Sequence, residues 1–281
     1  MIRVDYSEPS SAEWKQWKAA QAAQAAKARD AFKAGDPPPE VGDPIDEDRK
    51  AEIREAFHRK CAFCEAPITI KKPGNVRRYR PPSQVYDIDG NRVRITAGDL
   101  KFLHPGYFWL ANEPSNLLYT CSGCAPKDER KRDCFPVLGD EYGWPPGKEN
   151  DEVRLLFHPI DDDPEQFLNL DGGSGILVGA DERAQVSIEV LGLNREELRD
   201  VRSKTFAKVS ALLESVCNAN PSKPDQATFI NGTLDTIVSS SKPSHPYSFV
   251  YRSALKKYRP RIKPLLDELL ALASRRRQPR P

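Results

Sequence analysis

The sequence has almost no excess of either charge. Its 43 lysines and arginines against 41 aspartates and glutamates leave a formal net charge of +2. This balance argues against a surface that attracts nucleic acid everywhere, so we expect any basic site to be local. Two groups of basic residues are dense enough for such a site: Lys71, Lys72, Arg77, Arg78 and Arg80 form the first, and Arg275, Arg276, Arg277 and Arg280 form the second. The second group is typical of a solvated chain end.

Long apolar runs are also absent. No segment approaches the roughly 18 apolar residues of a membrane span, and the N-terminal MIRVDYSEPSS lacks the basic start and apolar core of a secretory leader. The glycines at 172–175 lack the Lys-Ser/Thr that would make them a phosphate-binding loop. We therefore expect a cytoplasmic protein without membrane contact, in which cysteines stay reduced.

Two Cys-x-x-Cys pairs stand out among the six cysteines. They are Cys61 with Cys64, and Cys121 with Cys124. In a reducing compartment, paired cysteines at this spacing indicate metal before disulfide, and four thiolates suit tetrahedral zinc. Four protein ligands leave no open position, so we predict a structural zinc site at the base of a long insert. Cys134 and Cys217 are expected to be ordinary buried thiols.

Helix signals occur in both the N-terminal and the C-terminal parts of the chain. Ser10 and Glu13 have capping-box spacing before an Ala/Lys/Gln-rich stretch that ends near Lys33. A second helix is expected over 45–59, where Ile53 and Phe57 share one face.

Three further helices are expected in the last third of the chain. Asn194 is the expected cap of the first. Its apolar stripe comprises Phe206, Val209, Leu212, Leu213 and Val216. The other two are expected over about 226–238 and 247–273.

Short β-prone runs lie between these helices, at 68–70, 93–95, 153–157 and 175–178, and Asp89–Asn91 carries a strong turn signal. The aromatic-rich segment 104–121 is expected to be buried. Together these features predict an α+β fold. We expect a helical N-terminal extension and linker over 1–44, a zinc domain over 45–140 and a mostly helical domain over 141–281.

Several motifs resemble one known family. They are KCAFCE at 60–65, HPGYFWLANEPSNLLYTCSGC at 104–124, CFPV at 134–137 and SIEVLGLNR at 187–195. Taken together over about 45–205, they resemble the bacterial HNH endonucleases of the retron and Septu antiphage type. The resemblance implies a zinc-stapled ββα core, a role in antiviral defence and an ATPase partner.

The positions that carry catalysis depart from the family pattern. Its Glu-His-Phe-Arg-Pro-Lys falls on 77–82, so Arg77 stands for the acid, Arg78 for the histidine and Pro82 for the lysine, while Arg80 is kept. A metal-binding asparagine after the second cysteine pair falls on Ala125. Asn116 is retained and is a candidate catalytic residue, and Lys127 can match the family lysine.

This replacement changes what the site can do. Arginine keeps its proton at neutral pH, so Arg78 cannot activate a water, and Arg77 places a positive charge where a divalent cation would bind. Arginine does hold phosphate well. We therefore expect a pseudo-nuclease that binds nucleic acid, DNA rather than RNA, through Lys71, Lys72, Arg77, Arg78, Arg80 and Lys127.

Two alternatives remain open. In one, the chain is an active Mg²⁺- or Mn²⁺-dependent nuclease that uses His104 as its base and Asp87, Asp89 or Asp99 as metal ligands. In the other, the protein only binds a partner protein, through the long helices at either end, and the arginines are simply solvated.

Overall fold

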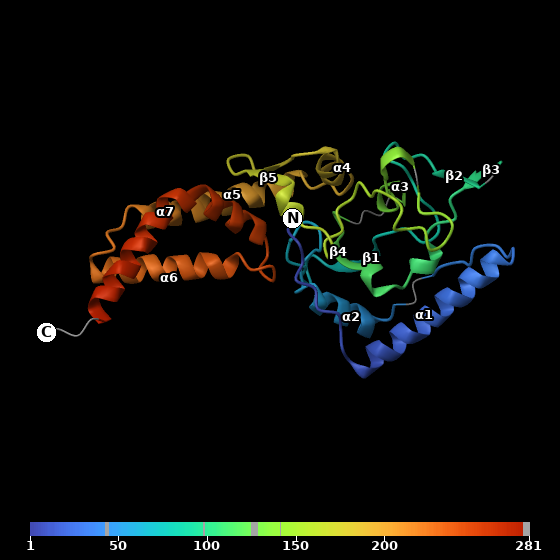
Figure 1. Cartoon of the computed structure of the whole chain (residues 1–281), viewed down its shortest axis with the longest axis horizontal. Coiled ribbons are helices and arrows are strands. Elements are labelled where there is room, and N and C mark those ends of the chain that lie inside the picture. The colour runs from blue at the N-terminus through green and yellow to red at the C-terminus, as the bar shows by residue number, and fades with distance from the viewer. Residues whose placement is uncertain (43–44, 98, 125–128, 141, 278–281) are drawn as a thin grey trace. The chain divides into compact units, whose positions relative to one another are not determined.

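The computed structural model (Figure 1) describes residues 1–42, 45–97, 99–124, 129–140 and 142–277. It divides into two compact units. Unit 1 comprises Met1–Leu168 and Gly179–Leu193, and unit 2 comprises Asn169–Val178 and the chain from Asn194 onward. This division differs from the expected boundaries at 44 and 140, because the N-terminal helix belongs to the same unit as the cysteine pairs.

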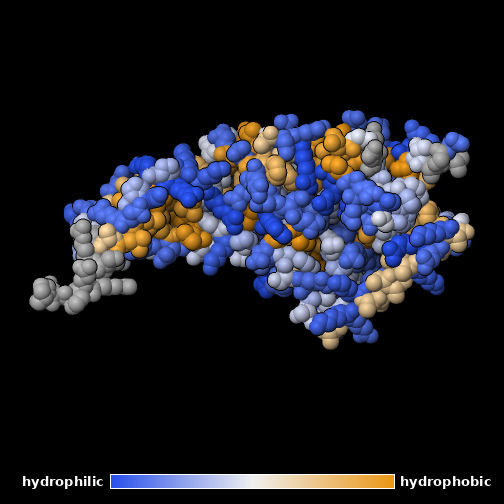
Figure 2. Space-filling view, viewed as in Figure 1, coloured by the Kyte–Doolittle hydropathy of each residue, from blue (hydrophilic) through white to orange (hydrophobic). Residues whose placement is uncertain are grey.

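Helix α1 (Ala12–Lys33) opens unit 1. Its N-cap is Ser11, whose hydroxyl accepts a hydrogen bond from Trp14 N, so the expected capping box on Ser10 is wrong by one residue. Trp14 is fully buried and anchors the start of the helix, and Phe32 packs against Phe108 near its end. Between these anchors, Figure 2 shows weakly hydrophobic and hydrophilic residues side by side along α1, as its alanine- and lysine-rich sequence predicts.

Helix α2 (Glu47–Ala56) leads the chain into the first cysteine pair. The Asp46 carboxylate caps it by accepting a hydrogen bond from Arg49 N. Ile53 on this helix and Phe57 just after it are both buried, as the expected shared face requires. The helix ends before 59 because His58 and Arg59 adopt positive φ and turn the chain.

Strands β1 (Gly74–Arg78) and β4 (Leu117–Cys121) form an antiparallel pair. Gly74 lies opposite Cys121, and Arg78 lies opposite Leu117. The sequence did not indicate β1, and the strand expected at 68–70 is absent from the described residues, where Thr69 and Lys72 only form an isolated bridge. The polar GNVRR becomes a strand because it pairs with the buried LLYTC segment of β4, a tertiary effect that outweighs local preference.

Strands β2 (Arg94–Ala97) and β3 (Leu100–Leu103) form a hairpin between β1 and β4 in sequence. This confirms the strand expected near 93–95. The predicted turn also forms, because the Asp87 carboxylate accepts hydrogen bonds from Asn91, although this turn precedes the hairpin and does not connect its strands.

The remainder of unit 1 consists of short elements around an aromatic core. They are η1 (Phe108–Leu110), η2 (Pro114–Asn116), α3 (Glu129–Arg132), η3 (Leu138–Asp140), η4 (Pro164–Gln166) and α4 (Glu182–Val190). Tyr107, Phe108 and Trp109 are buried, which confirms the expectation for the aromatic segment. The strand expected at 153–157 is not formed; Arg154 makes only an isolated bridge to Val137.

Unit 2 contains most of a small hairpin and three long helices. The strands are β5 (Leu168–Asp171) and β6 (Ile176–Gly179), and the helices are α5 (Glu196–Cys217), α6 (Pro224–Ser240) and α7 (Ser248–Arg277). They confirm the strand expected at 175–178 and all three predicted helices. The apolar core is shared by the helices and comprises Phe206, Val209, Leu213, Val216, Ile230, Leu234, Ile237, Val250, Ala254 and Ile262.

Two details of α5 differ from expectation. Leu212 is 38% exposed and lies outside the apolar core, whereas its neighbour Leu213 is fully buried. Asn194 does not cap the helix. The Asn194 side chain instead accepts a hydrogen bond from Leu177 N and donates one to Leu177 O in β6. Arg195 occupies the N-cap position, and its side chain makes no capping hydrogen bond. Among the described residues, no helix is both long and apolar enough to cross a membrane.

Candidate functional site

The two cysteine pairs meet at the base of the β1–β4 ribbon. Cys61 and Cys64 lie in the turn after α2, Cys121 ends β4, and Cys124 lies in the turn that follows. Their four Sγ atoms all lie within 4.8 Å of one another. Beside the cluster, Gly74 allows the start of β1 to lie close to Ile68 and to β4. A Cβ at this position would lie 2.6 Å from Ile68 Cδ1 and 2.7 Å from the Thr120 carbonyl oxygen.

The donor set fits one zinc ion. Zinc–sulfur bonds of about 2.3 Å in tetrahedral geometry place two sulfur atoms about 3.8 Å apart. The Sγ atoms of Cys64 and Cys121 are 3.6 Å apart. Backbone hydrogen bonds between residues close in sequence shape both turns: Glu65 N donates to Cys61 O, and Cys124 N donates to Cys121 O. Cys61, Cys64, Cys121 and Cys124 could therefore hold a metal such as zinc, which would fix α2, β1 and β4 to one another.

The thiols favour a cation on electrostatic grounds too. Burial raises the pKa of Cys61 well above its usual range, whereas hydrogen bonding from Cys124 lowers the pKa of Cys121. Four thiols this close cannot all ionise without a compensating positive charge. A bound divalent cation supplies that charge, which is why metal binding and deprotonation are linked.

Arg77 is buried beside this cluster, with only 6% of its surface exposed. Its Nη1 donates to the Cys124 carbonyl oxygen at 2.5 Å, and its Nη2 donates to the Arg132 carbonyl oxygen at 2.6 Å. Burial lowers the pKa of Arg77, while the charges of Cys124 and Asp133 oppose that shift. A zinc ion with four thiolates would carry two net negative charges. The Arg77 guanidinium lies where its single positive charge would offset part of this charge.

Arg78 is half-buried and ties three chain segments together. Its Nε donates to the Ala111 carbonyl oxygen at 2.7 Å. Its Nη2 donates to the Gly42 carbonyl oxygen at 2.9 Å and to Asn112 Oδ1 at 3.2 Å. This guanidinium therefore connects β1 to the residues after α1 and to the residues after η1.

Asn116 positions the backbone of Arg80. Its Oδ1 accepts a hydrogen bond from Arg80 N at 2.7 Å, and its Nδ2 donates to the carbonyl oxygens of Arg80 and Leu110. The Arg80 side chain then pairs with the fully buried Glu152 carboxylate, with Nε 2.7 Å from Oε1. Tyr107 donates a further hydrogen bond to Glu152. In this structure, Asn116 holds a chain segment in place.

His104 is fully buried, and its Nδ1 accepts a hydrogen bond from Gly106 N at 3.0 Å. Burial lowers the pKa of His104 to about 4. Among the described residues, the four cysteines are the only histidine, cysteine or carboxylate group close enough to hold a metal ion. His104 therefore does not meet Asp87, Asp89 and Asp99 in a preformed metal site.

The predicted basic residues do not form one exposed surface. Lys71 and Lys72 are exposed, Arg78 and Arg80 are half-buried, and Arg77 is buried. Tyr79, which lies among them, is only 2% exposed, and its hydroxyl donates to the Leu156 carbonyl oxygen, so it cannot stack on a base. Ala125, Lys127 and Arg280 lie outside the described residues. β1 places Arg77 inside the protein and leaves Arg78 half-buried, so the predicted basic residues differ in their exposure.

Sequence reasoning missed a polar cavity of about 510 Å³ next to Arg80. Arg154, His158, Glu152 and Asp161 contribute to its lining. His158 Nε2 lies 2.9 Å from the Ser115 carbonyl oxygen, to which it donates, and burial lowers the pKa of this histidine. The segment 149–162 is rich in charge and carries a histidine, which was the signal available in the sequence.

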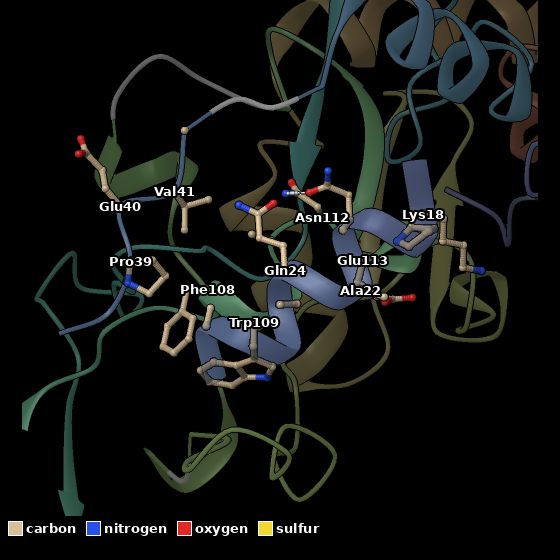
Figure 3. Close-up of a pocket in the computed structure, with 16 residues that line it drawn as sticks. Lys18, Ala22, Gln24, Pro39, Glu40, Val41, Phe108, Trp109, Asn112 and Glu113 are labelled. Carbon is tan, nitrogen blue, oxygen red and sulfur yellow. Dashed lines mark hydrogen bonds between the residues drawn. The ribbon is translucent and has the colours of Figure 1, made fainter. Parts of the chain in front are cut away.

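A smaller pocket of about 130 Å³ lies where α1 meets the segments 39–42 and 108–114 (Figure 3). Asn112 and Gln21 are hydrogen-bonded at 2.7 Å beside it. None of the candidate residues predicted from the sequence lines this pocket.

The chain is similar to two Septu proteins of Bacillus mycoides (strain KBAB4). It is 30% identical to Septu protein PtuB over 161 residues, which cover 57% of this chain and 51% of PtuB. It is 31% identical to Septu protein PtuA over 163 residues, which cover 57% of this chain and 21% of PtuA. The similarity thus spans about half of PtuB and about a fifth of PtuA. No family model and no solved structure matches the chain.

Proposed function

We propose that this homologue of the Septu proteins is a non-cutting, zinc-stapled subunit of an antiphage defence assembly that binds nucleic acid. One observation carries the non-cutting part. The two residues at the family's acid and histidine positions, Arg77 and Arg78, both use their guanidinium groups to bond backbone carbonyl oxygens. The side chains at the catalytic positions hold the fold together.

The chemistry of hydrolysis supports the same proposal. A ββα nuclease needs a base to activate water and a divalent cation to stabilise the leaving oxygen. We expect β1, β4 and the short helix α3, which follow one another in this order along the chain, to correspond to the ββα core that the resemblance implies. At its base position Arg78 stays protonated, and the buried cation of Arg77 opposes binding of a second metal nearby.

The alternative of an active nuclease based on His104 has less support. His104 lies fully inside the protein, where its burial denies it contact with a phosphate, and its pKa of about 4 makes it a weak base at neutral pH. Mg²⁺ or Mn²⁺ would also need ligands, and the aspartates considered for that role do not surround it.

A protein partner is the second part of the proposal. The chain is similar to both PtuA and PtuB, two different Septu proteins. The family resemblance in the sequence implies an ATPase partner. Nucleic acid held by this chain would then be presented to another subunit of the assembly.

One titration tests binding and cleavage together. Purified protein with quantified zinc is mixed with labelled single- and double-stranded DNA and RNA, with Mg²⁺ or Mn²⁺ present. We expect binding that weakens steeply with salt, without cleavage. Metal-dependent cleavage that is lost in His104→Ala would overturn the proposal and establish the alternative.

Restoring the histidine alone should not restore cutting. We expect Arg78→His to leave cleavage at background, because Arg77 still opposes the metal, while the loss of the bonds to Ala111 and Gly42 lowers stability. Cleavage assays with Mn²⁺ and a thermal melt check both results. Cutting by Arg78→His at more than background would show that the site lacks only its base.

A further inference from the structure

A groove of about 610 Å³ lies along the β2–β3 hairpin of unit 1. Its lining includes three cations, Arg92, Arg94 and Lys101, and two aromatic residues, Tyr142 and Trp144. Among the described residues of its lining, Asp87 is the one acidic residue. This volume is in the range of small-ligand sites, and the lining combines positive charge with aromatic rings.

The hairpin places its cations on one face. Val93 and Ile95 are buried, whereas Arg94 and Thr96 between and after them are exposed, as strand alternation requires. Lys101 lies directly opposite Thr96 in the antiparallel register, so it shares the exposed face with Arg94.

These cations remain available for a ligand. No ion pair within the described ranges includes Arg92, Arg94 or Lys101, and Arg94 Nη2 makes only a 3.5 Å contact with the Lys101 carbonyl oxygen. The arginines of β1 differ in this respect, because Arg77 and Arg78 donate hydrogen bonds to backbone carbonyl oxygens of the protein. The Asp87 carboxylate accepts two hydrogen bonds from Asn91 within a turn, so these bonds do not involve the three cations of the groove.

Trp144 supplies a surface for a flat ring. It is half-buried, and its contacts with Phe32, Phe102 and Trp109 are edge-type, without a parallel stack among the described rings. Aromatic side chains beside a basic groove are how proteins hold single-stranded nucleic acid, with the base on the ring and the phosphates on the cations.

We infer that this groove binds a single-stranded nucleic-acid segment, with phosphates on Arg92, Arg94 and Lys101 and a base against Trp144. This inference rests on the proposed function and gives it a location different from the basic residues at 71–80. The exposed lysines Lys15 and Lys27 of α1 belong neither to the groove nor to that basic group, so they provide a control for the specificity of the groove.

The test compares two matched double variants. Arg92→Ser/Arg94→Ser removes two exposed cations from the groove, and Lys15→Ser/Lys27→Ser removes two exposed cations elsewhere in unit 1. Binding of a labelled 12-nucleotide DNA and RNA strand is measured over a range of salt concentrations. The logarithm of the affinity falls as the logarithm of the salt concentration rises, and each lost phosphate contact reduces the magnitude of this negative slope by about 0.7. We expect the magnitude of the slope to be about 1.4 smaller for the groove variant, and unchanged from the wild type for the lysine variant.

A third variant tests the aromatic surface. Trp144→Leu should weaken strand binding by about tenfold without changing the salt slope, because stacking is not an ionic contact. Zinc content and thermal midpoints, measured on every variant, separate a binding defect from a folding defect.

The other outcomes each decide something. If the wild type binds strands and the groove variant binds equally well, this inference is wrong and the proposed function stands. If the wild type binds double-stranded nucleic acid but no single strand, the groove inference alone is wrong. If it binds neither, the nucleic-acid part of the proposed function is wrong as well. If a mononucleotide displaces the strand at equal concentration, the groove takes nucleotides, and the assignment to a strand is overturned.

Discussion

Arg77 shows how a buried arginine beside the cysteine cluster can become part of the scaffold. Its guanidinium lies between the carbonyl oxygens of Cys124 and Arg132, which are 47 and 55 positions away in sequence. A glutamate at this position would add negative charge beside four thiolates. An arginine there offsets that negative charge, so we expect Arg77 to support metal binding by the four cysteines.

Replacing Arg77 with methionine should therefore weaken both fold and metal binding. Arg77→Met removes two hydrogen bonds, to the Cys124 and Arg132 carbonyl oxygens, and a buried cation. We expect the free energy of unfolding to fall by about 3–5 kcal/mol and zinc to be released faster to a chelator. Denaturant titration and a chromophoric zinc assay measure the two effects. Lys71→Met, which removes an exposed cation from the same unit, should change neither.

His104 gives unit 1 a defined response to acid. Because burial lowers its folded pKa to about 4, below the unfolded value of about 6.5, the unfolded chain takes up a proton first. Stability from this group is complete above pH 6.5 and is lost as the pH falls towards 4. By pH 5 the loss should reach about 2 kcal/mol.

The variant His104→Asn isolates this contribution. It retains an acceptor for Gly106 N but cannot titrate. Acid also protonates the thiols, but that effect is common to both proteins. The unfolding free energy of the variant should therefore fall less steeply between pH 7 and pH 5. Equal slopes would mean that His104 is not protonated more readily in the unfolded chain.

Among the elements, the long periodic helices were predictable, and the short strands were predictable only in part. α1, α6 and α7 follow from residue preference and apolar spacing along one segment. β1 does not, since GNVRR has little strand character until LLYTC of β4 lies beside it. The cysteine cluster was predictable because each pair is local. The roles of Arg77 and Asn116 were not, because their partners come from distant segments.

Two adjacent leucines in α5 test the core of unit 2. Leu213 is fully buried, whereas Leu212 is 38% exposed. We expect Leu213→Ala to lower the free energy of unfolding by about 2–5 kcal/mol, since it leaves a cavity among three helices. Leu212→Ala should cost less than about 1 kcal/mol. Denaturant unfolding followed by circular dichroism compares them, and similar losses would place Leu212 in the core after all.

At the scale of the whole molecule, the metal cluster belongs to one unit only. The four cysteines of the cluster lie in unit 1, and the helical core of unit 2 contains no residue of that cluster. The two units therefore depend on different sources of stability. Unit 1 has an aromatic core and a cysteine cluster that could hold a metal, while unit 2 relies on helix packing.

Chelation should consequently affect the units unequally. After zinc removal, we expect amide hydrogen exchange to accelerate in peptides from α2, β1 and β4, and to stay slow in those from α5, α6 and α7. Cys61→Ser should reproduce this pattern. Cys217→Ser, which removes a thiol outside the cluster, should not. Faster exchange in both units would contradict separate stabilisation.

The ribbon that joins Gly74 to Cys121 has a consequence for how this protein can diverge. Everything between these residues is a closed loop whose ends are fixed by strand pairing. Doubling the length of such a loop costs only about 0.6 kcal/mol of closure entropy. Insertions and deletions around the β2–β3 hairpin can therefore accumulate at little energetic cost to its base, so this loop is free to evolve new contacts while the cysteine cluster stays unchanged.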